Sequence, residues 1–333
     1  MKAFFALFCL CLINCLLLAA EPTAAELKTF QETKAKAEKG DAAAQYSLGW
    51  WYATAGNGMP KDDAEAVKWF RMASGQGFAE AQGWLGLMYH QGRGVPKDDV
   101  EATGWWRKAA DQGNAQAQRS LGWMYANGGT GVAKDDAEAV KWFRKAAEQG
   151  NADAQVNLGE MYVKGRGVAK DDAEAVKWFR KAAEQGNAEA QKGLGAMYAA
   201  GKGVPKDEKE AYGWYCKWAE QGNGETQHNL GLMCETGLGV PKDATQAARW
   251  HRKSANQGSG YGQYSLGLCY EYGRGVIKDE VEAYKWFLLS EVYGYRYAHE
   301  KFPAIERKLT PAQRAESQRL AREWKPQIPQ KAP

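Results

Sequence analysis

Beyond its first 20 residues, the sequence lacks any hydrophobic run long enough to cross a membrane. It also lacks a block of consecutive basic residues, because its 44 Lys and Arg are interspersed with 40 Asp and Glu and leave a net charge of only +4. The missing basic block argues against binding to nucleic acid. The apolar–polar alternation typical of strands is missing as well, so we expect an all-α protein.

The short motifs of common catalytic and metal sites are also missing. The histidines, His90, His228, His251 and His299, show no H-E-x-x-H spacing, and beyond the first 20 residues no cysteine pair has zinc-ligand spacing. There is no G-x-S-x-G elbow and no S-x-x-K nucleophile of the penicillin-recognising enzymes. Gly-rich turns such as 201–206 lack the Gly-Lys-Ser/Thr ending of a phosphate-binding loop. We therefore expect no catalytic residue, no cofactor and no metal.

What the sequence does contain is a repeat of 36 or 37 residues. The segments 131–155 and 167–191 differ only at Asp153 and Glu189. Self-similarity of this period marks a repeat architecture. A Leu-Gly pair and a Trp each recur seven times, and both series count seven repeats. The Leu residues are Leu48, Leu85, Leu121, Leu158, Leu194, Leu230 and Leu266, and the Trp residues are Trp69, Trp105, Trp142, Trp178, Trp214, Trp250 and Trp286.

Each repeat is expected to form two helices joined by a turn. In the repeat that starts at Asn151, a predicted N-cap, apolar residues four positions apart predict the first helix. Gly159 leaves room there for the close approach of a second helix. Asp171, with Glu174 three positions on, predicts a capping box that opens this second helix. The predicted core positions are Ala154, Leu158 and Tyr162 on the first helix and Ala175, Trp178, Phe179, Ala182 and Ala183 on the second.

One hairpin cannot bury its apolar stripe alone, so the hairpins must stack into a solenoid. We expect seven repeat units over 41–294, with the seven repeat Trp residues in the core. A capping helix over 21–40 and capping helices over 295–325, the last starting at Thr310-Pro311, would protect the two ends. Residues 326–333 are rich in Pro and polar residues and are expected to be a disordered tail.

These features resemble the Sel-one-like repeat (SLR) family, a relative of the tetratricopeptide repeats. The shared pattern is A-x-x-x-L-G-x-x-Y, a G-x-G-V-P-x-D turn, and A-x-x-W-(F/Y)-x-x-A-A-x-x-G, from about Asp41 to Gly294. The resemblance implies an α/α superhelical solenoid that serves as a scaffold or adaptor, and its bacterial members are often exported. Repeat 6 departs from the pattern, because Cys234 takes the Tyr position and His251 follows the Trp.

In such a solenoid the first helices line the concave face. The positions of this face that point away from the predicted core vary widely between repeats, whereas the second helices of repeats 3 and 4 are nearly copied. Recognition of a partner would produce this variation, and so would relaxed constraint. The predicted partner-binding residues are Tyr46, Trp50, His90, Arg119, Trp123, Glu160, Lys192, His228, Glu235, Tyr264 and Glu271.

We therefore expect a non-catalytic protein–protein interaction scaffold that binds a protein or peptide on this face. Exposed Tyr46, Trp50 and Trp123 would supply aromatic contacts of the kind enriched at binding hot spots. The alternative is a peptidoglycan- or glycan-associated envelope protein whose aromatic groove stacks on sugar. An enzyme of the β-lactamase type is less favoured, because its nucleophile is missing. Capped solenoids are commonly monomeric, and we expect a monomer.

The N-terminus has the composition of a targeting segment. Lys2 precedes an apolar run from Ala3 to Ala20, and small residues follow it. We predict a Sec-type signal peptide over 1–20, cleaved after Ala20 or Ala25, and a periplasmic or secreted protein without a stable membrane span. An uncleaved anchor and lipidation at Cys15 are weaker alternatives.

Three cysteines, Cys216, Cys234 and Cys269, would remain after cleavage. In an oxidising compartment one disulfide is expected at most, and Cys234 with Cys269 is the best pair because both lie on first helices of adjacent repeats. The odd number leaves at least one thiol free or paired between molecules. The alternative is that all three stay reduced and packed.

Overall fold

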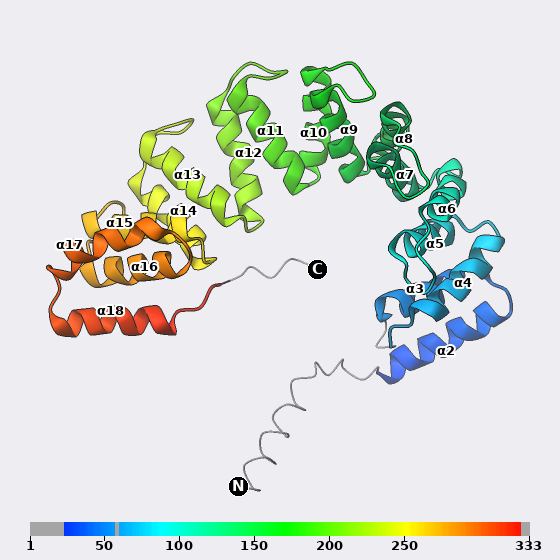
Figure 1. Ribbon diagram of the computed structural model, residues 1–333, viewed down its shortest axis with the longest axis horizontal. Helices are drawn as coiled ribbons and strands as arrows, with labels where there is room; N and C mark the ends of the chain where they lie inside the picture. Colours follow the sequence, from blue (N-terminus) through cyan, green and yellow to red (C-terminus); the bar gives the residue numbers. More distant parts are fainter. Residues whose placement is uncertain (1–22, 57–59, 328–333) are drawn as a thin grey trace, which may run out of the picture. The chain divides into compact units, whose positions relative to one another are not determined.

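The computed structural model describes residues 23–56 and 60–327, and Figure 1 shows its arrangement. Over these residues the chain is all-helical, with one isolated β-bridge between Gly129 and Val132, so the predicted fold class is confirmed. The predicted signal peptide lies outside the described residues, as do residues 328–333 of the predicted tail.

Fourteen of the described helices form seven consecutive pairs, one pair for each repeat. The first helices are α3 (Ala42–Thr54), α5 (Ala79–Gln91), α7 (Ala115–Asn127), α9 (Ala152–Lys164), α11 (Ala188–Ala200), α13 (Gly224–Thr236) and α15 (Gly260–Tyr272). The second helices are α4 (Asp63–Gly75), α6 (Asp99–Asp111), α8 (Asp136–Glu148), α10 (Asp172–Glu184), α12 (Glu208–Glu220), α14 (Ala244–Asn256) and α16 (Glu280–Val292).

The chain divides into two compact units, Met1–Asn151 and Ala152–Pro333, which we call the N-terminal and C-terminal units. The N-terminal unit holds repeats 1–3 behind the capping helix α2 (Ala24–Glu38). The C-terminal unit holds repeats 4–7, followed by the 3₁₀ helix η2 (Arg296–Lys301) and the helices α17 (Phe302–Glu306) and α18 (Pro311–Glu323). Within each unit the hairpins follow one another side by side in chain order (Figure 1).

The Leu-Gly pair brings the two helices of each hairpin into close contact. All seven Leu side chains are fully buried. The glycine after each of them lies against a ring of the second helix: a Cβ at Gly159 would come within 2.9 Å of Phe179, and one at Gly122 within 2.5 Å of Phe143. The approach predicted at Gly159 is therefore confirmed, and any larger residue there would push the helices apart.

The second helices are capped by aspartate, but the predicted capping box is wrong in its second half. The Asp171 side chain accepts hydrogen bonds from the amides of Ala173 and Glu174, as expected. A capping box would also need the glutamate to bind the Asp171 amide, but that amide already donates to the Tyr162 carbonyl. The glutamate of this position turns to a neighbouring lysine instead, as Glu138 does toward Lys141 at 3.0 Å.

The repeat Trp residues are only partly in the core, which corrects the prediction for three of them. Trp142, Trp214, Trp250 and Trp286 are buried, whereas Trp69, Trp105 and Trp178 are half-buried. At two of these three a lysine one turn further along covers a ring face: Lys108 lies 4.0 Å from the Trp105 ring and Lys181 lies 4.2 Å from the Trp178 ring. A cation over the ring stabilises this partly solvated position.

A buried glutamine on each first helix ties neighbouring helices together. The Gln118 amide donates to the Ala110 carbonyl of α6 at 3.1 Å, and its oxygen accepts from the Gln149 amide at the end of α8 at 2.7 Å. The same pair of bonds recurs at Gln45, Gln82, Gln191 and Gln227. At the last repeat Tyr293 replaces the terminal glutamine, and the Gln263 oxygen has no hydrogen-bond partner among the described residues.

We predict that Gln118→Met lowers the free energy of unfolding by about 1–3 kcal/mol, because it leaves the buried Ala110 carbonyl unpaired and removes the bond to the Gln149 amide. The exposed Gln116 of the same helix provides the control, and Gln116→Met is expected to change stability by less than about 0.5 kcal/mol. Urea unfolding followed by circular dichroism measures both. Equal losses in the two variants would show that the buried bonds contribute nothing.

Candidate functional site

The predicted partner-binding residues fall into two separate groups, one on each compact unit. The N-terminal unit carries Tyr46, Trp50, His90, Arg119 and Trp123. The two Trp side chains are 39% and 41% exposed, which agrees with the prediction that they face solvent. The C-terminal unit carries Glu160, Lys192, His228, Glu235, Tyr264 and Glu271, of which Glu160 and Lys192 are exposed and the next three are half-buried.

Glu271 is not available to a partner, which corrects the prediction of an accessible carboxylate. It is only 4% exposed. Its oxygens lie 3.3 Å from the Lys301 ammonium and 3.1 Å from that of Lys308. Both lysines belong to the C-terminal cap, which folds over the end of α15. Sequence spacing within repeat 7 could not reveal this, because the covering lysines come 30 and 37 positions later.

The predicted pairing of Cys234 with Cys269 is not found, since Cys216, Cys234 and Cys269 are all free thiols. Cys234 follows its Leu-Gly leucine by four positions and Cys269 by three, so the two side chains point in different directions around their helices. Cys234 packs with Tyr212 and Trp250, whereas Cys269 packs with Leu266 and Trp286. The reduced alternative therefore describes this structure.

A pocket of about 420 Å³ opens on the first-helix face of the N-terminal unit, around Gly83. Gly83 stands where the other repeats carry Tyr46, Arg119, Val156, Lys192, His228 or Tyr264. Its missing side chain creates the space, because a Cβ there would meet only the Asn114 side-chain oxygen, at 3.9 Å. We call this the Gly83 pocket; its other lining residues are Tyr46, Glu80, Trp84, Leu87, Trp106, Asn114, Gln116, Ala117, Arg119 and Ser120.

Aromatic side chains hold the Gly83 pocket in shape. The Trp106 indole is buried and donates to the Gly83 carbonyl at 3.1 Å, which fixes the ring under the pocket. Trp84 stacks on the buried Phe70 ring at 5.7 Å, and Tyr46 lies 6.1 Å from the same ring. Burial raises the pKa of the Tyr46 phenol, so this group stays neutral at physiological pH. The aromatic walls of the pocket are therefore held in place before any partner binds.

One acidic and one basic side chain line the Gly83 pocket. Glu80, on the first turn of α5, is exposed and forms no ion pair or hydrogen bond with the other described residues. Arg119, on α7, is half-buried, and its guanidinium donates to the Gln116 side-chain oxygen at 2.6 Å. An apolar pocket with an anion and a cation beside it can bind one bulky side chain and orient its charged neighbours.

The aromatic surface continues from the Gly83 pocket through His90 to Trp123. The His90 ring lies 5.6 Å from Trp106 and 5.4 Å from Trp123. Its Nδ1 is 2.7 Å from the buried Asp99 carboxylate, which fixes the ring between the two indoles. Burial opposes ionisation of Asp99, but bonds from the Thr130 amide and from His90 hold its pKa below its usual range. Sequence spacing singled out His90 and Trp123 but missed Asp99, Trp84 and Trp106.

A second aromatic surface lies on the C-terminal unit and consists of four tyrosines. Tyr261 and Tyr264 of α15 lie 4.9 and 4.8 Å from Tyr295, which in turn lies 5.8 Å from Tyr297. Tyr261 and Tyr297 are 59% and 63% exposed. We call this the tyrosine cluster. Only Tyr264 was predicted; the run Tyr293–Tyr297, with a tyrosine at every second position, was the signal for the others.

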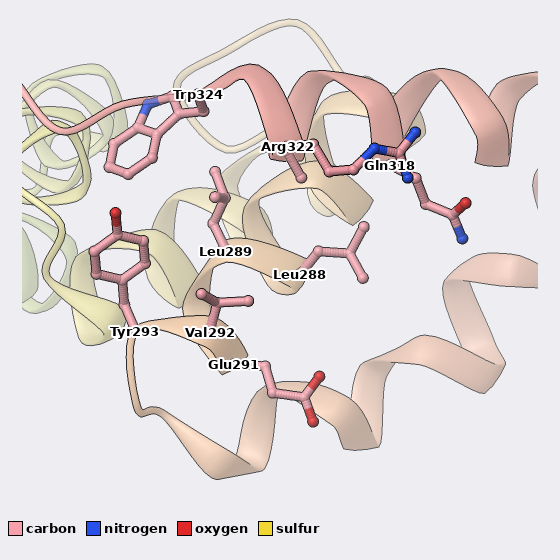
Figure 2. Close-up of a pocket in the computed structure, with 9 residues that line it drawn as sticks. Leu288, Leu289, Glu291, Val292, Tyr293, Gln318, Arg322 and Trp324 are labelled. Carbon is pink, nitrogen blue, oxygen red and sulfur yellow. The ribbon is translucent and has the colours of Figure 1, made fainter. Parts of the chain in front are cut away.

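Another pocket, of about 460 Å³, lies between α16 and α18, where the last repeat meets the cap. In Figure 2, Leu288, Leu289 and Val292 of α16 lie on one side of this pocket, and α18 lies on the other side. Tyr293 and Trp324 close one end with their rings 5.4 Å apart. No predicted site residue lines this pocket.

No helix over 23–56 and 60–327 is both long and apolar enough to span a membrane. In the same part of the chain, no group of three or more His, Cys, Asp or Glu side chains is placed to hold a metal ion.

Among the solved structures that resemble this chain are two bacterial proteins with at least 35% identity. One is c5321, described as a protective antigen present in uropathogenic Escherichia coli strains displaying an SLR fold, with 37% identity over 89% of this chain and a TM-score of 0.67. The match covers 63% of c5321, so this chain spans less than two thirds of that protein. The other is a Sel1 repeat protein from Oxalobacter formigenes, with 35% identity, a TM-score of 0.66, and 84% of this chain and 80% of that chain covered.

No curated protein matches this chain. The Sel1 repeat pattern, in contrast, matches seven consecutive segments, which are 42–78, 79–114, 115–151, 152–187, 188–223, 224–259 and 260–290. These segments coincide with the seven helix pairs, and together they cover most of the sequence. The chain therefore belongs to the Sel1 repeat family, as the resemblance to SLR proteins predicted.

Proposed function

We propose that this protein is a non-catalytic scaffold that binds a peptide segment of a partner protein on the first-helix face of its N-terminal unit. The observation that carries the proposal is the Gly83 pocket: a preformed apolar space, walled by Tyr46, Trp84 and Trp106, in a frame where other repeats fill the same position. Membership of a repeat family supports a scaffold role, and exposed Trp50 and Trp123 extend the aromatic surface beyond the pocket.

The chemistry of the pocket defines the partner segment. A bulky apolar side chain would fill the space over Trp106, and burial of such a side chain contributes about 1.5–3 kcal/mol. An acidic neighbour would pair with Arg119, and a basic neighbour would pair with Glu80. Exposed ion pairs contribute little affinity, so these charges mainly orient the segment.

We also propose that this protein acts outside the cytoplasm. A periplasmic or secreted protein follows from the apolar segment after Lys2 and the small residues behind it. The description of the E. coli relative as a protective antigen is in keeping with such a location.

Filling the pocket tests the proposal. We predict that Gly83→Tyr weakens binding at least tenfold for peptides selected from a random display library on the wild-type protein, because the new ring occupies the space of the partner side chain. Gly83→Ala is the matched control: its methyl group has room, and helix propensity raises stability by up to about 1 kcal/mol. Fluorescence anisotropy with the selected peptides measures affinity. Equal binding by Gly83→Tyr would overturn the proposal.

The exposed tryptophans provide a separate test. We predict that Trp50→Ala and Trp123→Ala each weaken binding of the same peptides, by up to about tenfold, while helicity and melting temperature stay close to those of the wild type. Both side chains are about two-fifths exposed, so their removal leaves no internal cavity. Unchanged affinity in both variants would restrict the contact surface to the pocket itself.

The tyrosine cluster favours a second candidate function, association with cell-wall glycan. Exposed aromatic rings are suited to stacking on sugar faces, and tyrosine hydroxyls can hydrogen-bond to sugar hydroxyls. Tyr261 and Tyr297 are the most exposed members.

For this second function, we predict that Tyr261→Ala combined with Tyr297→Ala reduces co-sedimentation with purified sacculi severalfold. Tyr272→Ala removes another exposed tyrosine, 50% exposed, from the other end of α15 and is expected to leave co-sedimentation unchanged. A wild-type protein that stays in the supernatant, or equal losses in both variants, would reject a glycan site at the tyrosine cluster.

A further inference from the structure

Repeat 6 carries a histidine where the other six repeats carry a large aromatic ring. His251 of α14 lies under Gly231, and a Cβ on that glycine would come within 2.3 Å of the imidazole. The same contact is made by Phe, Trp or Tyr elsewhere, for example by Phe179 under Gly159. A titratable group thus occupies a core position of the hairpin.

The His251 ring is buried without hydrogen bonds. Its exposure is 0%, and neither ring nitrogen has a hydrogen-bond partner among the described residues. Nε2 lies 3.5 Å from the Glu235 carboxylate, which is too long for a good hydrogen bond but close enough for an ion pair once the ring is protonated. A buried polar group without hydrogen bonds costs free energy, so the core of repeat 6 is less stable than it would be with an apolar ring at this position.

Polar and titratable side chains near the His251 ring come from α13, from α15 and from the turn that follows α15. From α13, the His228 ring lies 5.3 Å from that of His251, and Glu235 faces it as described. From α15, Ser265 contacts His228 at 3.4 Å and the Tyr261 ring lies 5.9 Å from it, while Cys269 faces Glu235. Arg274, in the turn that follows α15, adds a positive charge near Glu235. The cluster therefore holds two imidazoles and one carboxylate.

We propose that repeat 6 is an acid-sensitive joint, in which protonation of His228 beside the buried His251 ring loosens the packing of α14 against α13 and α15 while the neighbouring repeats stay folded. A charge on the His228 ring, 5.3 Å from the buried His251 ring, would be poorly hydrated, and the Glu235 carboxylate of the cluster lies against His251 instead. Release of the charged ring to water removes this cost, and this requires the helices to separate. Repeat proteins permit such local opening, because each repeat contacts only its neighbours.

The direction of the pH effect follows from His228. Burial, and then the neighbouring His251, lowers the pKa of His228 from 6.5 to about 4. The opened state therefore binds more protons than the closed state between these values, and the closed state loses stability as the pH falls through that window. The His251 ring holds the pKa of Glu235 below its usual 4.5, so the Glu235 contribution is lost only at still lower pH. Both effects favour opening in acid.

Hydrogen exchange followed by mass spectrometry on the full chain tests this proposal. After correction for the intrinsic exchange rate, peptides within 224–272 should lose protection by roughly tenfold to thirtyfold between pH 7 and pH 5. A pKa of His228 that is 6.5 in the opened state and about 4 in the closed state implies a loss of this size. Peptides within 188–220, which cover α11 and α12, should change by less than about twofold and serve as the internal control.

The matched variant combines His228→Val with His251→Phe, the residues that repeat 4 carries at Val156 and Phe179. Because repeat 4 folds with this pair, the variant should fold and should keep its protection over 224–272 at pH 5. A wild-type protein with equal protection at both pH values would overturn the proposal, and so would a variant that loses as much protection as the wild type.

Discussion

The stacking of this protein depends on a buried glutamine that each first helix contributes. Hydrophobic burial draws the hairpins together but is not directional, so it does not fix how one hairpin sits on the next. Gln118 supplies that direction, because its amide group binds the end of α6 and the end of α8 at once. An error in register would leave the buried Gln118 side chain and the Ala110 carbonyl unpaired, at a cost of about 1–3 kcal/mol for each group.

This fixed frame explains where the chain can vary. The Leu-Gly pair, the aspartate cap and the glutamine serve the contacts between helices, and a change at any of them disturbs a neighbour. The position of Gly83 makes none of these conserved bonds and holds residues from glycine to tyrosine in the seven repeats. The proposed binding function and the proposed acid response both arise from single departures in such a frame: a missing side chain at Gly83 and an ionisable ring at His251.

Much of the fold could be predicted from the sequence, because its determinants are local. Helix caps, four-residue spacing and the 36-residue period identified the hairpins and their order. The prediction failed where a backbone amide could form its hydrogen bond either within its own helix end or with another helix. The amide of Asp171 was assigned to a capping box, but the Tyr162 carbonyl from the first helix takes it. The glutamines were overlooked, since a polar residue on a helix reads as exposed unless its partners on other helices are known.

The candidate site was predicted only in part, because contacts with other helices decide which of its side chains are accessible. The sequence by itself determined the family, the seven hairpins and the face on which Tyr46, Trp50 and Trp123 lie. Only the tertiary structure decided which of the predicted positions are open: Lys301 and Lys308 cover Glu271, and the absence of a side chain at Gly83 opens a pocket beside Arg119. Burial is set by what packs from other helices, and one helix's sequence does not contain that information.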